Sequence, residues 1–102
     1  MIESSKNVEL KATGVRFFSP GDESAFFEWL DKLPFVARYE GHGRTLYISI
    51  NSIAVDEYGL REMLALFRRY GVELRQLALF DRDEFAEWFR DKQAYWYKDV
   101  FD

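Results

Sequence analysis

The spacing of apolar residues changes several times along this chain, and these changes constrain the fold more than any other feature of the sequence. Between residues 8 and 12, apolar and polar residues alternate, which is the pattern of a strand with one buried face. Beyond Thr13 and Gly14 the alternation resumes one residue out of phase, and glycine tolerates the backbone angles of a bulge. We therefore expect a first strand that begins near Val8 and carries a bulge at residues 13–14.

Two longer segments carry apolar residues at the three- and four-residue spacing of an amphipathic helix, and both have recognisable ends. The first begins with Ser19 as its cap and Pro20 in its first turn, and it ends before Pro34. The second begins at Asp56, whose carboxylate can accept hydrogen bonds from free amide groups, and it ends at Gly71.

A hairpin is expected between these helices, because alternating segments flank the sequence Gly41-His42-Gly43. A two-residue turn with glycine in its first position forms the type II′ geometry, which suits a hairpin. We place this turn at Gly41-His42. The resulting register pairs Phe35 with Ile48, Ala37 with Leu46, and Tyr39 with Arg44.

The last third of the chain is predicted to hold a fourth strand over residues 72–80 and a third helix from Asp81. Arg75-Gln76 interrupts the alternation of that strand, whereas Asp81 and Glu84 have the spacing of a helix-capping box. The order β-α-β-β-α-β resembles that of ferredoxin-like proteins, whose antiparallel sheet carries two helices on one face. We therefore expect an α+β fold of this kind with an extra C-terminal helix. Element order alone implies no function.

Length and composition are those of one globular domain over residues 1–102, of which only the polar residues 1–6 are expected to be disordered. The net charge is −4, there is no cysteine, and His42 is the single histidine, so we expect no metal centre and no cofactor. No apolar run approaches the roughly 20 residues that cross a membrane, and no signal peptide is recognisable. These features predict a soluble, cytoplasmic protein that binds neither membranes nor nucleic acid.

The C-terminal segment holds the densest group of aromatic residues and is the first candidate for an interaction surface. The candidate interface consists of Trp88, Tyr95, Trp96, Tyr97 and Phe101. Trp and Tyr are favoured anchors of protein interfaces, although the same rings could instead pack on their own domain. No nucleophile is accompanied by a base and an orienting group. The first hypothesis is therefore a non-catalytic module that self-associates or binds a protein partner through this helix.

Two alternatives rest on the charged residues. One is a ligand-binding protein or weak enzyme with a ring-lined pocket between helix and sheet, in which Arg16, Arg38 or Arg44 holds an acidic ligand. The other is an acidic inhibitor of a basic protein, with which the net charge is compatible. The densest basic group can contact an anion or an acidic partner, or it can stabilise the end of the second helix. This group is Arg61, Arg68, Arg69 and Arg75, of which Arg68, Arg69 and Arg75 are the candidate anion contacts.

Overall fold

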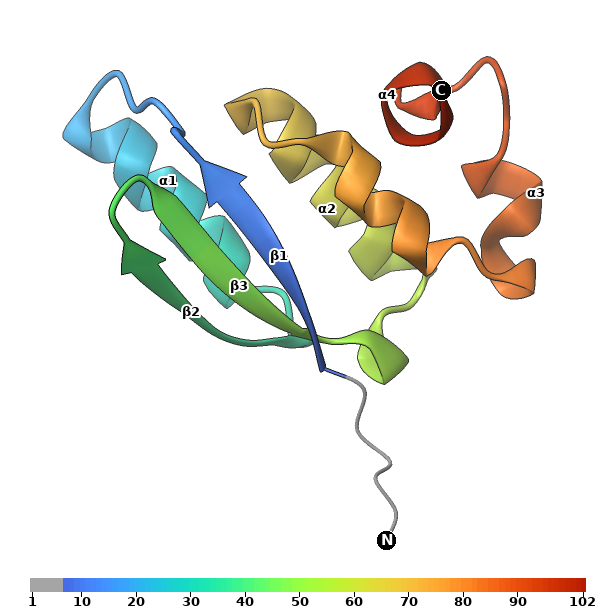
Figure 1. Cartoon of the computed structure of the whole chain (residues 1–102), viewed down its shortest axis with the longest axis horizontal. Coiled ribbons are helices and arrows are strands. Elements are labelled where there is room, and N and C mark those ends of the chain that lie inside the picture. The colour runs from blue at the N-terminus through green and yellow to red at the C-terminus, as the bar shows by residue number, and fades with distance from the viewer. Residues whose placement is uncertain (1–6) are drawn as a thin grey trace, which may run out of the picture.

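The computed structural model describes residues 7–102, so the predicted disorder of residues 1–6 concerns a segment outside the described part of the chain. Its sheet consists of β1 (Asn7–Thr13), β2 (Val36–His42) and β3 (Thr45–Asn51). Neighbouring strands are antiparallel, in the order β1-β3-β2 (Figure 1). Helices α1 (Pro20–Asp31) and α2 (Glu57–Tyr70) bury apolar residues in one core with the inner face of the sheet. The fold is α+β, as predicted.

Both long helices begin and end as the sequence predicts. Ser19 Oγ accepts a hydrogen bond from the Asp22 amide at 3.1 Å, and Asp56 Oδ1 accepts one from the Gly59 amide at 2.8 Å. These side chains satisfy amide groups that have no partner inside the helix. Helix α2 ends at Gly71, which adopts the left-handed backbone conformation with φ of 70°.

The predicted hairpin forms, but its predicted register is wrong. The two-residue turn is Gly43-Arg44, and Gly43 has the positive φ of 61° that a type II′ turn needs in its first position. Moving the turn by two residues pairs Tyr39 with Ile48 instead of Arg44. This register gives the Tyr39 ring an apolar cross-strand neighbour, and it leaves the predicted core face of β3 unchanged. The irregularity of the sheet lies between Val36 and Arg38, and the predicted bulge at residues 13–14 is absent because β1 ends at Thr13.

The predicted fourth strand is wrong, because residues 74–80 form a 3₁₀ helix, η2 (Leu74–Phe80). Leu74, Leu77 and Phe80 are all buried, and their three-residue spacing matches the three residues per turn of a 3₁₀ helix. In a strand, by contrast, Leu74 and Leu77 would lie on opposite faces. The described chain therefore has a three-stranded sheet and not the four-stranded ferredoxin-like arrangement.

The predicted third helix is divided into three short pieces. These are the 3₁₀ helix η3 (Asp83–Phe85), α3 (Ala86–Phe89) and α4 (Tyr97–Phe101). In a continuous helix the Phe89 carbonyl would accept a hydrogen bond from the Gln93 amide. Here the Trp96 indole N–H donates to that carbonyl at 2.8 Å, and the Gln93 amide donates to Asp91 Oδ1 at 2.9 Å. The predicted capping box does not form either, since the Asp81 carboxylate binds the Arg90 guanidinium.

Candidate functional site

A cleft of about 320 Å³ lies at the end of the sheet where β1 leads into α1 and where the β2–β3 hairpin turns. It is formed by the segment after β1, by one side of α1, and by the hairpin turn. Its lining residues are Ala12, Gly14, Val15, Arg16, Phe17, Phe26, Phe27, Gly41, Gly43, Arg44, Thr45 and Leu46. The volume falls at the lower end of the range typical of small-molecule sites, which is about 300–1,000 Å³.

Gly14 and Arg44 hold two sides of this cleft together. The Gly14 amide donates a hydrogen bond to the Arg44 carbonyl at 2.8 Å, and Gly14 has a positive φ of 67°. A Cβ at this position would lie only 3.2 Å from Arg44 Nη2. Glycine therefore serves two purposes here, since it adopts the left-handed conformation and lets the guanidinium lie close to the backbone.

Aromatic rings form one wall of the cleft. The Phe17 ring lies 5.4 Å from that of Phe26 and 6.2 Å from that of Phe27, measured between ring centroids. The Tyr70 ring, which comes from the last residue of α2, lies 6.1 Å from that of Phe17. These rings pack the segment after β1 against both helices, so the wall is part of the core.

The two arginines of the cleft lack a carboxylate partner among residues 7–102. Two acidic residues of the adjoining segments are already engaged. Asp22 Oδ2 accepts a hydrogen bond from the Phe18 amide at 3.0 Å, and Glu40 Oε2 lies 3.1 Å from His42 Nε2. The cleft thus combines an apolar wall with two positive charges whose hydrogen-bond donors can bind an anion. Arg38, the third arginine that we considered as a contact for an acidic ligand, does not line the cleft.

A second feature beside the cleft is Phe18, the most exposed large apolar side chain of the described residues, with 84% of its surface accessible. The Arg16 guanidinium lies 5.8 Å from the centre of its ring. This is a cation–π contact at the surface, and the Phe18 ring itself does not line the cleft.

The predicted basic group is brought together only in part, around the end of α2. Arg68 Nη1 lies 3.2 Å from Asp99 Oδ2, and Arg75 Nη2 donates to the Asp102 carbonyl at 2.6 Å. Two of the three candidate anion contacts thus bind the C-terminal segment of their own chain. The hollow between Arg68 and Arg75, about 470 Å³ in volume, is also lined by Lys98, Glu73 and Asp99. Its charge is mixed, so it is a weaker anion site than the cleft.

The candidate interface at the C-terminus packs largely on its own domain. Trp96 is only 7% exposed, and its ring lies 5.9 Å from that of Trp88. Trp88 is half-buried, and the Arg61 guanidinium covers it at 4.2 Å from the ring centre. Tyr97 and Phe101 are half-buried and pack against each other at 5.2 Å. Tyr95 is the exception, since half of its surface is accessible.

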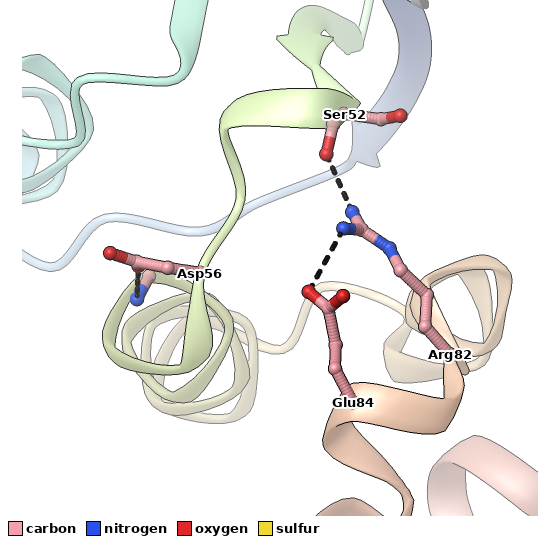
Figure 2. Close-up of polar contacts among 5 residues, drawn as sticks. Ser52, Asp56, Arg82 and Glu84 are labelled. Carbon is pink, nitrogen blue, oxygen red and sulfur yellow. Dashed lines mark hydrogen bonds and ion pairs between the residues drawn. The ribbon is translucent and has the colours of Figure 1, made fainter.

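A polar contact around Arg82 attaches the C-terminal third of the chain to the segment that follows β3 (Figure 2). Its guanidinium donates to the Ser52 carbonyl at 2.5 Å, in η1 (Ser52–Ala54) directly after β3, and it lies 3.5 Å from Glu84 Oε2. The same group lies 5.2 Å from the Phe85 ring centre. Asp56, also drawn in Figure 2, caps α2 and takes no part in this contact. The donors of Arg82 are thus occupied by structural partners, which distinguishes Arg82 from Arg16 and Arg44.

Comparison with protein-family models, with curated proteins and with solved structures finds no match to this chain. Among residues 7–102, no helix has the length and apolar character needed to cross a membrane. The same residues contain no group of three or more His, Cys, Asp or Glu side chains placed to hold a metal ion. The candidate site therefore has to be interpreted from its own geometry.

Proposed function

We propose that this protein binds a small organic acid in the cleft between α1 and the hairpin. The observation that carries this proposal is the pairing of Arg16 and Arg44 with an aromatic wall, in a chain whose net charge is −4. Both arginines are exposed, so their guanidinium groups are accessible to a ligand and can donate charge-assisted hydrogen bonds to its acidic group. The proposal concerns binding, and it assigns no reaction to the cleft.

The chemistry of the cleft favours a ligand with one acidic group and a compact apolar body. A carboxylate or a phosphate monoester accepts hydrogen bonds from a guanidinium in pairs, which fixes its orientation. An aromatic or branched body then packs on the Phe17 and Phe27 rings, beside Arg16. The volume of about 320 Å³ leaves no room for a large ligand such as a dinucleotide.

The test is a thermal-shift screen followed by calorimetry with four probes, which are benzoate, phenylacetate, phenyl phosphate and inorganic phosphate. A ligand that binds only the folded state raises the melting temperature, and about 100 times its Kd adds about 2.7 kcal/mol to the free energy of unfolding. We expect the aromatic acids to bind more tightly than inorganic phosphate, because they alone use the rings. Failure of all four to bind at millimolar concentration would contradict the proposal.

Arg38 offers a matched control for this test. Like Arg16 and Arg44 it is an exposed arginine without an ion pair among the described residues, but it lies outside the cleft. Arg16→Gln and Arg44→Gln should each weaken binding by about tenfold, which corresponds to about 1.4 kcal/mol. Arg38→Gln should leave the affinity unchanged. Equal effects of all three substitutions would indicate a general charge effect and no specific site.

A further inference from the structure

The two outer strands of the sheet, β1 and β2, differ in whether another part of the chain binds their outer edge. At the β1 edge, the Gln76 side chain of η2 binds the backbone of Lys11 twice. The Lys11 amide donates to Gln76 Oε1 at 2.7 Å, and Gln76 Nε2 donates to the Lys11 carbonyl at 2.8 Å. The Gln76 amide thus makes one pair of the hydrogen bonds that a fourth strand would make, and it occupies the backbone of one residue at the β1 edge.

The β2 edge has no comparable cover. Among residues 7–102, β2 pairs only with β3, and Figure 1 shows no segment of these residues beyond it. Within residues 7–102, the backbone of residues 38–42 has hydrogen bonds only to β3. Residues 37, 38 and 40–42 are all exposed. An uncovered edge of this kind can pair with another extended strand.

The hairpin determines which β2 groups face outward. His42 and Thr45 flank the two-residue turn, so they exchange their backbone hydrogen bonds with each other. Because these bonds alternate along an antiparallel pair, Arg38 and Glu40 also bond to β3. The amide and carbonyl groups of Tyr39 and Gly41 therefore point to the open edge.

β2 carries a positive charge at Arg38 and a negative charge at Glu40, one on each side of Tyr39. When two copies pair antiparallel with Tyr39 opposite Tyr39 of the second copy, Arg38 lies opposite Glu40 of the second copy, and the reverse pair is identical. Such opposite-charge pairs contribute about 0.2–1 kcal/mol each. Centring the pair one residue earlier or later would place Arg38 opposite Arg38, or Glu40 opposite Glu40, and like charges oppose pairing.

We propose that the β2 edge is the contact surface for a second copy of this chain, which joins the two sheets into one six-stranded sheet about a two-fold axis. The irregularity between Val36 and Arg38 limits the pairing to a few residues. The contact is therefore smaller than a standard protein interface, and we expect a dimer that forms at about 10 μM to 1 mM. We infer a second copy of this chain as the partner, because an antiparallel copy of β2 places Glu40 opposite Arg38 and Arg38 opposite Glu40.

Sedimentation equilibrium of the full chain between about 10 μM and 1 mM tests this proposal. We expect a concentration-dependent dimer for the native chain. Arg38→Glu and Glu40→Arg each create two like-charge pairs, and each should weaken the dimer by at least about tenfold, or about 1.4 kcal/mol. Thermal melts of the separate variants check that they remain folded, which is expected since both side chains are exposed.

Mixing the two variants provides the decisive result. Arg38→Glu paired with Glu40→Arg restores two opposite-charge pairs, so the mixture should form a heterodimer although each variant alone is a monomer. A native chain that stays monomeric up to about 1 mM would overturn the proposal. A dimer that is unaffected by both substitutions, or that is lost instead in Tyr95→Ser, would also overturn it, and the last result would place self-association at the C-terminal segment. The acid-binding cleft is tested separately, by the Arg16 and Arg44 variants.

Discussion

Two regions of this molecule combine arginine with aromatic rings, and they differ in what the arginines bind. In the C-terminal region Arg61 covers Trp88, while Arg68 contacts Asp99 and Arg90 contacts Asp81. In the cleft, Arg16 and Arg44 have no carboxylate partner among residues 7–102. The same residue types thus contact side chains of the fold in one region, and have no carboxylate partner among the described residues in the other. A high density of rings and cations is therefore insufficient to identify a binding site.

The largest expected effect tests whether the C-terminal rings are part of the core. Trp96→Ala should lower the free energy of unfolding by about 3–5 kcal/mol, because it removes a buried ring and the hydrogen bond to the Phe89 carbonyl. Urea denaturation measures this loss. Tyr95→Ala is the control, with an expected loss below about 1 kcal/mol because this ring is half exposed. Equal losses for the two variants would show that Trp96 is no more a core residue than Tyr95.

The next effect compares single arginines of the two regions. Arg82→Gln should cost about 1–2 kcal/mol of stability, since the Ser52 carbonyl loses its charged donor and keeps only the Val55 amide, and the Phe85 ring loses its cation. Arg16→Gln should change stability by less than about 0.5 kcal/mol in the absence of ligand. Chemical denaturation of both variants in one buffer gives the comparison. A larger loss for Arg16→Gln would make that arginine a structural residue.

An effect of similar size is expected at the backbone of the cleft. Gly14→Ala requires a left-handed conformation from a residue with a Cβ, which costs about 1–2 kcal/mol. It also brings that Cβ to within 3.2 Å of Arg44 Nη2, so the guanidinium has to move. We expect a modestly lower melting temperature together with weaker binding of the acidic probes. Gly71→Ala has a similar positive φ, no atom within 4 Å of the added Cβ and no place in the lining of the cleft, so it serves as the control for strain alone.

The smallest effect is a dependence of stability on pH. Burial is the main cause that raises the pKa of Tyr70 above its usual value, and the contact with Asp22 adds to it. Because the folded-state pKa is the higher one, the protonated tyrosine contributes its full stability below about pH 10. That contribution is lost as the pH rises through the folded-state pKa. Urea titrations at pH values between about 9 and 11 should therefore show a steeper loss of stability for the native chain than for Tyr70→Phe.

The elements that the sequence predicted correctly depend on local chemistry. Ser19, Asp56 and Gly71 act through groups within a few residues of themselves, so the ends of both long helices could be predicted. The hairpin register was wrong because Gly41 and Gly43 both suit the first position of the turn, and local preference does not separate them. The choice between them depends on the cross-strand contact of Tyr39 with Ile48.

The C-terminal third and the cleft depend on contacts between distant parts of the chain. The three-residue spacing of Leu74, Leu77 and Phe80 is typical of a 3₁₀ helix and indicates η2. The prediction of a strand rested on the alternation of apolar residues and did not use this spacing. Arg16 and Arg44 could be suggested from charge alone. Their place in one cleft depends on the bond between the Gly14 amide and the Arg44 carbonyl, which are thirty residues apart in sequence. The ring wall that Phe17 and Phe27 form across two elements could not be predicted either.

The amide of Gln76 has a consequence for the size of any assembly that this chain forms. A sheet with one free edge can pair once about a two-fold axis, and the resulting assembly is closed. A sheet with two free edges can add further copies at both ends, and such growth leads to fibres. By occupying the amide and carbonyl of Lys11, Gln76 blocks strand pairing at one residue of the β1 edge. In the proposed dimer, this glutamine would therefore oppose the addition of further copies at β1.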